Sequence, residues 1–306
     1  MGRYPAGPRV VAGIGAVLVA GYFGMLLPTG LQEQGYPLAA TVALATAIPL
    51  VAFLGLLAFA PDAPQAVLRR VSRADLRDSG HALAVIVMAC AIFFVLGYGS
   101  LTNGIYAYEH EVVRDEPSDP ISGDAIFVGI ALNLIVLVLP AMLYVGVVGA
   151  GPGGALERLG LHSRNAMRAL LVGFASALAV LVVIAVISAA IEGLEVDVPE
   201  NERALEIARS VTVLGAIGIA VGASVSEEVF FRGFLQPRIG LLGQAVLFSL
   251  AHLTYLNVLQ VVVTFVLALL FGIIYRSTGN LLAPMAAHFL FNLLMLLAGI
   301  YAPETS

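Results

Sequence analysis

Long apolar segments recur along the chain and are separated by shorter polar loops. A helix that crosses a bilayer needs about 20 consecutive apolar residues. The candidates have approximate limits of 10–27, 38–60, 81–98, 125–148, 169–191, 210–231, 240–255, 258–275 and 281–300. The pattern therefore predicts an all-α fold, a polytopic transmembrane helical bundle of about eight spans.

The stretch from 240 to 275 is too long for one span, although most of it is apolar. At about 1.5 Å per residue it would extend about 54 Å, whereas the hydrocarbon core of a bilayer is about 30 Å thick. We therefore predict that the turn around Thr254–Asn257 divides it into two helices.

Composition agrees with a membrane protein. Hydrophobic residues make up 60% of the 306 residues, and charged residues make up only 11%, whereas soluble domains carry about 25% charged residues. A soluble fold could not bury this much apolar surface, so the expected partner is the lipid bilayer. The net charge of -5 gives no indication of a nucleic-acid partner.

The basic residues are distributed unevenly between the two sides of the predicted bundle. One side has only Arg114, Arg203 and Arg209. The other side has Arg3, Arg9, Arg69, Arg70, Arg73, Arg77, Arg158, Arg164, Arg168, Arg232, Arg238 and Arg276. Because cytoplasmic loops carry an excess of basic residues, we place the second side and the N-terminus in the cytoplasm.

All 15 basic residues are arginines, and none is lysine. This usage suggests a GC-rich or halophilic prokaryote, although codon drift explains it equally well. We expect a multi-pass protein of a prokaryotic plasma membrane. The flexible loop Gly149–Gly154 is the best candidate boundary between an N-terminal four-span region, 1–150, and a C-terminal membrane region, 151–306.

Ionisable side chains inside three predicted spans mark a candidate site, because a charged group in hydrocarbon is costly and is usually functional. The polar residues of these spans are Glu227, Glu228, Arg232, His252, His288 and Asn292. The helical rise puts Glu227, His252 and His288 at similar depths, about 12–18 Å from the same membrane face. The three spans are therefore predicted to bring their polar residues together.

Helical spacing predicts which of these side chains share a face. Glu228 and Arg232 are four residues apart and are expected to form an ion pair. Glu227 points about 100° away and lacks that partner. His288 and Asn292 also share a face, and the ring of Phe248, one turn before His252, can pack against the His252 ring.

The residue types suit amide hydrolysis. Glu227 with His252 could hold and deprotonate a water molecule. His288 and Asn292 could donate hydrogen bonds to the oxyanion that forms when this water attacks a carbonyl group. Arg232, held by Glu228, could orient the carboxylates, meet a substrate carboxylate, or simply fix the end of the helix.

The same polar residues allow other interpretations. Glu227, His252 and His288 could instead bind zinc, with Asn292 or Glu228 nearby. The chain has no His-Glu-x-x-His motif and no Gly-x-Ser-x-Gly elbow, so ordinary zincins and serine types are disfavoured. A non-catalytic membrane scaffold or an ion-coupled transporter could also use these buried polar residues.

Three motifs resemble those of the CPBP family, which comprises CAAX prenyl endopeptidases of the Rce1 type and bacteriocin-processing or immunity proteins. Residues 227–233 resemble its Glu-Glu-x-x-x-Arg motif, residues 248–252 its Phe-x-x-x-His motif, and residues 288–292 its His-x-x-x-Asn motif. They occur in the right order, on separate predicted spans. The resemblance covers a core of about residues 205–296.

The resemblance implies the same roles as the chemistry does. Glu227 and His252 would activate water, and His288 and Asn292 would form the oxyanion hole. Glu228, Arg232 and Phe248 would support them. The family has been described both as metal-free glutamate proteases and as metalloproteases, so the resemblance implies no cofactor or, alternatively, zinc.

The resemblance also implies a location and a substrate. The Rce1 type works from a conical intramembrane cavity open to the cytoplasmic side, and it removes a C-terminal tripeptide after a prenylated cysteine. A membrane-associated peptide or a prenylated protein is therefore the expected substrate. An immunity protein that keeps the fold without catalysis is the alternative that the family itself offers.

Overall fold

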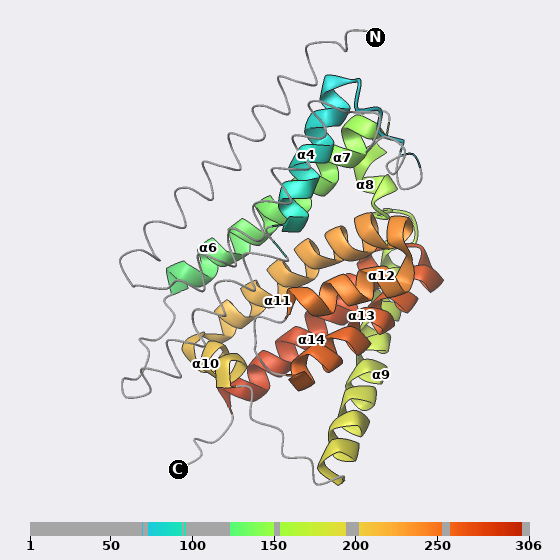
Figure 1. The fold of residues 1–306 in the computed structure, drawn as a ribbon. Coiled ribbons are helices and arrows are strands. Elements are labelled where there is room, and N and C mark those ends of the chain that lie inside the picture. Colours follow the sequence, from blue (N-terminus) through green and yellow to red (C-terminus); the bar gives the residue numbers. More distant parts are fainter. Residues whose placement is uncertain are drawn as a thin grey trace, which may run out of the picture. The chain divides into compact units, whose positions relative to one another are not determined.

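The computed structural model describes residues 69, 73–93, 95, 123–149, 154–193, 202–252 and 258–301 (Figure 1). The spans predicted at 10–27 and 38–60 lie outside these residues. Every regular element in the described part of the chain is a helix. The elements are α4 (Ser79–Phe93), α6 (Gly123–Asn133), η2 (Leu134–Val138), α7 (Leu139–Val148), α8 (Ala155–Arg158), α9 (Ala166–Gly193), α10 (Glu202–Ser210), α11 (Val213–Glu227), η4 (Glu228–Leu235), α12 (Gln236–Ala251), α13 (Val258–Thr278) and α14 (Leu282–Ile300).

Five helical stretches of the described chain are long and apolar enough to cross a membrane. They are Phe127–Val148, Ala166–Ile187, Val213–Ala251, Gln260–Thr278 and Leu282–Ile300. The all-helical, polytopic prediction is confirmed. α12 ends at Ala251 and α13 begins at Val258, so the stretch from 240 to 275 is divided where the sequence predicted.

The chain divides into two compact units, which are described separately. One consists of 1–114 and 140–155, and its described helices are α4 and most of α7. The other consists of 115–139 and 156–306 and holds α6, η2, nearly all of α8, and α9 to α14. All the candidate residues lie in this second unit. The boundary predicted at residue 150 between two membrane regions stays a prediction.

α14 is the central helix of the second unit. It packs against α9, α10, α11 and α13, which surround it in Figure 1. Its buried residues Ala283, Ala287 and Phe291 form a core with residues of α9 and α13, among them Phe271. The backbones of α9 and α14 approach so closely at Gly173 that a Cβ there would collide with the Ala283 carbonyl.

This close approach is of the kind that membrane helices use. Within hydrocarbon there is little hydrophobic driving force between helices, so small residues at the interface let the backbones make close van der Waals contact. On α9, Ala169, Gly173 and Ala177 recur every four residues and face the core. The tight packing fixes α14, and therefore fixes the position of His288.

Two segments of the second unit are π-helical, and each precedes a proline. η2 is followed by Pro140, and η4 is followed by Pro237. Proline lacks an N–H and its ring clashes with the carbonyl four residues earlier, so the regular α-helical pattern cannot continue through it. In both segments the capping N–H bonds instead to the carbonyl five residues earlier, Leu139 to Leu134 and Gln236 to Phe231.

The long stretch Val213–Ala251 changes direction at Gly240. This residue has φ 80° and ψ 174°, a conformation that is open essentially to glycine alone. α11 with η4 therefore forms one helical segment, and the part of α12 after Gly240 forms another that runs in a different direction. The sequence predicted a division between residues 231 and 240, and the chain changes direction at Gly240.

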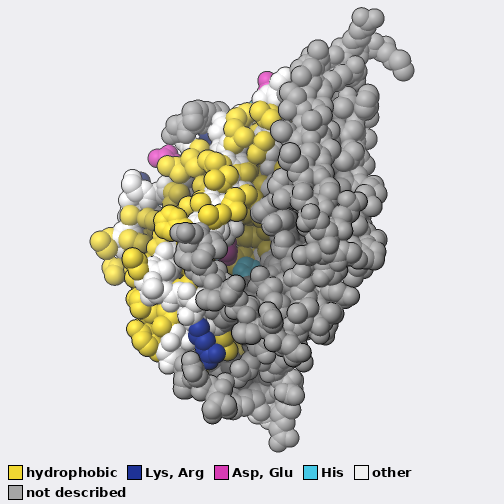
Figure 2. Space-filling model, turned by 90° about the vertical axis from the view of Figure 1, so that its left-hand side faces the viewer, with side chains coloured by type: hydrophobic (Ala, Val, Ile, Leu, Met, Phe, Trp, Pro, Cys, Tyr) yellow, Lys and Arg dark blue, Asp and Glu magenta, His cyan; other side chains and the backbone are white. Residues whose placement is uncertain are grey.

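Hydrophobic side chains cover most of the described surface in Figure 2. Large apolar residues are exposed along α6, α9 and α12, including Phe127, Leu178 and Leu242. In water such a surface would be strongly unfavourable, whereas against lipid it costs little. The described helices therefore have the outer surface expected of a membrane protein.

Candidate active site

A buried ion pair lies at the centre of the candidate site. The Arg232 Nη1 atom lies 3.0 Å from the Glu228 Oε1 atom, and both side chains are fully buried. The i to i+4 pairing predicted from the sequence is therefore present. It lies inside the π-helical segment η4, and such segments are rare and often occur at functional sites.

His288 joins this pair from a different helix. Its Nδ1 atom lies 2.8 Å from the same Glu228 Oε1 atom, which is a hydrogen bond across 60 residues of sequence. An ionised carboxylate only accepts hydrogen bonds, so Nδ1 must carry the proton and donate it. This contact fixes the orientation of the ring and leaves Nε2 for the other side.

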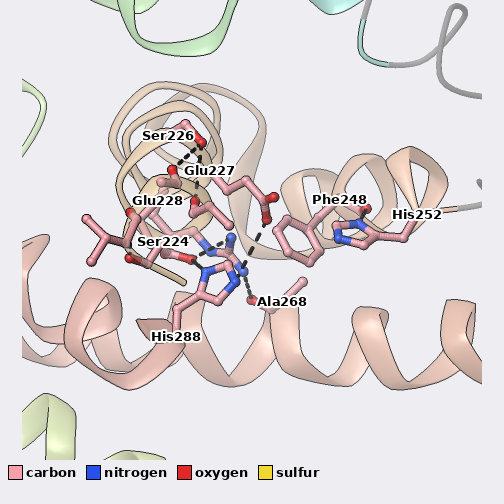
Figure 3. Close-up of polar contacts among 12 residues, drawn as sticks. Ser224, Ser226, Glu227, Glu228, Phe248, His252, Ala268 and His288 are labelled. Atoms are coloured by element: carbon pink, nitrogen blue, oxygen red, sulfur yellow. Dashed lines mark hydrogen bonds and ion pairs between the residues drawn. The ribbon is translucent and has the colours of Figure 1, made fainter. Parts of the chain in front are cut away.

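The Nε2 atom of His288 faces Glu227. The distance from Nε2 to the Glu227 Oε2 atom is 3.9 Å, too long for a direct hydrogen bond but suited to one bridging water molecule. Glu227 Oε2 is buried and has no hydrogen-bond partner among the residues that the structure describes. Figure 3 shows the two carboxylates approaching the His288 ring from opposite sides. The site thus has a buried acceptor oxygen that faces a histidine nitrogen.

Aromatic rings surround the charged groups. The Arg232 guanidinium lies 4.4 Å from the centre of the Phe248 ring and 5.5 Å from that of Phe271. The His288 ring stacks on Phe271 at 5.0 Å. Cation–π contacts of this kind stabilise an arginine side chain that is buried away from solvent. The sequence predicted a supporting role for Phe248 but not for Phe271, which lies in a span without ionisable residues.

His252 lies at the far side of Phe248. The two rings stack with centres 4.5 Å apart, as the spacing predicted, and the His252 Nδ1 atom lies 2.7 Å from the Phe248 carbonyl oxygen. In Figure 3 the Phe248 ring lies between Glu227 and His252. The structure therefore brings Glu227 next to His288 rather than next to His252. The joint role of Glu227 and His252 stays a prediction.

Asn292 lies one turn beyond His288 on α14 and is partly buried. Among the described residues no hydrogen bond to its side chain is present. Its position agrees with the shared face that the sequence predicted, and its amide is available for a substrate. Its role as an oxyanion donor stays a prediction.

Two buried glutamines were missed by the sequence reasoning. The Gln244 Nε2 atom donates to the Ala268 carbonyl at 3.0 Å, and the Gln236 Nε2 atom donates to the Gly272 carbonyl at 2.9 Å. Arg232 Nη2 also reaches the Ala268 carbonyl, at 3.5 Å. Gln244 therefore shares an acceptor with Arg232. Its signal in the sequence was a polar residue inside an apolar span, one turn before Phe248.

The nearby serines have structural hydrogen bonds. The Ser226 hydroxyl donates to the Gly222 carbonyl at 2.7 Å, and the Ser224 hydroxyl donates to the Val221 carbonyl at 3.0 Å. Such bonds to the preceding turn satisfy a hydroxyl inside a helix. Neither serine has a histidine among these partners, in agreement with the absence of a serine-protease motif.

The described residues do not form a three-ligand metal site. No three His, Cys, Asp or Glu side chains of the described chain lie close enough together to hold one ion. Of the residues considered for zinc, only Glu227 and His288 face each other, and His288 Nδ1 is already bonded to Glu228. A zinc site of Glu227, His252 and His288 does not fit this arrangement.

The geometry defines a class of site within a bundle of helices that are long and apolar enough to cross a membrane. A buried glutamate oxygen, of Glu227, faces a histidine, His288. The buried pair of Glu228 and Arg232 holds this histidine in place. Comparison with known proteins agrees with this class. Residues 209–294 match the family model described as type II CAAX prenyl endopeptidase Rce1-like. The resemblance inferred from the three motifs is confirmed, and this segment, which contains every motif residue, is similar to that family.

A curated relative matches part of this chain. It is the uncharacterized protein YpbD of Bacillus subtilis (strain 168), which is 42% identical over 69 residues. The match covers 22% of this chain and 36% of the relative, so the chain spans about a third of the length of that protein. No solved structure matches the chain.

Proposed function

We propose that this protein is an intramembrane endopeptidase that hydrolyses peptide bonds close to the membrane surface. The observation that carries the proposal is the pairing of Glu227 with His288. A buried carboxylate oxygen without a partner faces a histidine nitrogen at 3.9 Å, and that histidine is held by Glu228 and Arg232. This arrangement suits the activation of one water molecule.

Glu227 is the general base in this proposal. Its Oε2 atom accepts a proton from the bridging water, and the resulting hydroxide attacks the carbonyl carbon of the substrate. When the tetrahedral intermediate collapses, the carbon–nitrogen bond breaks and Glu227 returns the proton to the leaving amine. His252 stacks on the Phe248 ring and acts by holding that ring beside the site, because Phe248 separates it from this water.

His288 and Asn292 stabilise the oxyanion. With Nδ1 donating to Glu228, the His288 ring donates from Nε2 when it is an imidazolium, and the Asn292 amide donates from the next turn. Glu228 and Arg232 act as positioning residues, because Glu228 bonds to His288 and Arg232 pairs with Glu228.

The proposed substrate is a membrane-associated peptide, in particular the C-terminus of a prenylated or otherwise lipid-associated protein. Two observations support it. The matched family is described as CAAX prenyl endopeptidase-like, and the site lies among helices that are long and apolar enough to cross a membrane. A substrate held by a lipid group would therefore reach the site from the bilayer.

A defined peptide tests this proposal. The protein, purified in detergent, is offered a fluorogenic farnesylated CAAX peptide and the same peptide without the lipid, each with and without a chelator. We expect cleavage of the farnesylated peptide before its last three residues, unchanged by chelation. Loss of activity on chelation and its return with zinc would contradict the metal-free mechanism. Equal cleavage of both peptides would contradict the lipid-linked substrate.

A further inference from the structure

A polar pocket lies at the start of α9, on residues that the proposed peptidase mechanism does not use. Its volume is about 620 Å³, and its polar lining includes Glu157, His162, Arg164, Arg168, Thr278 and Asn280. The lining comes from α8 and the segment that follows it, from the first two turns of α9, and from the end of α13 with the turn after it. All of these lining residues belong to the second compact unit.

The walls of the pocket are held together by hydrogen bonds. The Leu281 N–H donates to the Gly160 carbonyl at 2.8 Å, and the Asn280 Nδ2 atom donates to the His162 carbonyl at 2.9 Å. Next to them, Leu159 is fully buried and its carbonyl contacts Gly233 of η4 closely enough to exclude a side chain there. The pocket is therefore a preformed feature of the fold.

Positive charge dominates the lining. Arg164 and Arg168 are both exposed. Within the described part of the chain, neither arginine side chain forms an ion pair or a hydrogen bond. Glu157 is the one acidic residue of the lining, and α9 has no acidic residue in its first turn. Arginine binds phosphate oxygens well because its planar guanidinium donates two parallel hydrogen bonds. The pocket is thus suited to an anion with several oxygen atoms.

Apolar side chains lie directly beside these arginines. Met167 is 69% exposed and Leu171 is 62% exposed, and both belong to a stretch that is long and apolar enough to cross the membrane, Ala166–Ile187. A ligand whose anionic end occupies the pocket would therefore have its apolar part along α9. That combination of a phosphate and hydrocarbon chains is a phospholipid.

We propose that this pocket binds the phosphate head group of an anionic phospholipid, with the acyl chains along Met167 and Leu171. Basic pockets at the ends of transmembrane helices are known to select such head groups. Binding there would hold the segment 156–165 against α14 and η4, which carry the site residues. The proposal goes beyond the peptidase activity and does not depend on it.

Native mass spectrometry of the full chain in detergent tests this site. The probes are dihexanoylphosphatidylglycerol, dihexanoylphosphatidylcholine and inorganic phosphate. We compare the wild type with the pocket variant R164Q/R168Q and with the control variant R209Q/R276Q, which removes the same charge at exposed arginines outside the pocket lining. The unfolding temperature of each variant verifies that it is folded.

We expect the wild type to retain phosphatidylglycerol in preference to phosphatidylcholine. A basic residue near an anionic lipid is worth about fivefold in affinity, so the pocket variant should bind phosphatidylglycerol about 25-fold more weakly, while the control variant keeps most of its affinity. Equal weakening in the two variants would overturn the pocket, as would a wild type without lipid preference. Binding of inorganic phosphate alone would overturn the lipid.

Discussion

Glu228 makes two of the closest polar contacts of the site through a single oxygen atom. Its Oε1 atom lies 3.0 Å from Arg232 Nη1 and 2.8 Å from His288 Nδ1, and the Glu228 and Arg232 side chains are fully buried. A buried ion pair is not in itself strongly stabilising, but removing one partner leaves the other charge buried and unpaired. The identity of this residue therefore controls both stability and the orientation of His288.

We predict that Glu228→Gln and Arg232→Met each destabilise the protein by about 3–5 kcal/mol, because each leaves one buried charge without its partner. The double variant should lose clearly less than the sum of the two. Chemical unfolding in detergent, followed by circular dichroism, measures these values. Additive losses would show that the two side chains do not depend on each other.

Asn292 tests the oxyanion part of the proposed mechanism. Replacing it by alanine should lower kcat by about 10²–10³ with little change in KM, because an oxyanion donor acts mainly in the transition state. Asn133→Ala, at an exposed position of α6, serves as the control for the loss of an amide. The rates of cleavage of the farnesylated peptide measure both variants, and a kcat within threefold of the wild type would exclude this role.

At the residue scale, the sequence predicted contacts along one helix better than contacts between helices. The Glu228–Arg232 pair and the stacking of Phe248 on His252 follow from spacing alone. The bond from His288 to Glu228 does not, because it depends on how α14 packs against α11 and η4. Helical spacing placed Glu227 about 100° from Glu228, yet both carboxylates face the His288 ring, since the ring offers two nitrogen atoms.

At the scale of elements, the helix that carries Glu228 and Arg232 is π-helical. The cause of this π-helical segment is Pro237, because a proline prevents a regular α-helix just after the Glu-Glu-x-x-x-Arg motif. The same relation holds for η2 and Pro140. Pro140 lies inside the predicted span 125–148, and Pro237 lies between the predicted spans 210–231 and 240–255. A proline within an apolar span could have indicated a widened turn before it.

The contact between α9 and α14 gives a prediction with a matched control. Gly173→Ala should destabilise the protein by about 1–3 kcal/mol, because the added methyl group collides with the Ala283 backbone and forces the helices apart. Gly129→Ala on α6 meets no atom within 4 Å and should be neutral or stabilising by up to about 1 kcal/mol. Unfolding in detergent measures both. Equal effects would contradict the close approach of α9 and α14.

The lengths of the elements were largely predictable, because apolar length and helical rise decide them. The predicted divisions near Thr254 and before Gly240 both occur. The small residues at 169, 173 and 177 were not recognised as a packing face, because in an apolar span they do not differ from their neighbours in polarity. Their role appears only when the partner helix is present.

At the scale of the whole molecule, the arrangement of arginines predicts the orientation in the membrane. With the N-terminus in the cytoplasm, the segment before α9 is predicted to face the cytoplasm, and the loop between the predicted spans 81–98 and 125–148, which contains Ser118, is predicted to face outward. In a Cys90→Ser background, which has no other cysteine, Ser163→Cys should react with an impermeant maleimide only in inverted vesicles. Ser118→Cys should react only in right-side-out vesicles, and the reverse pattern would contradict the orientation.

The central claim is that Glu227 is the base of a peptidase, and one comparison tests it most directly. Glu227→Gln keeps the shape of the side chain but cannot accept the proton, so the rate of cleavage of the farnesylated peptide should fall by about 10²–10⁴. The matched control, Glu195→Gln, makes the same change outside the segment that matches the family model and should retain the wild-type rate. Full activity of folded Glu227→Gln would contradict the mechanism.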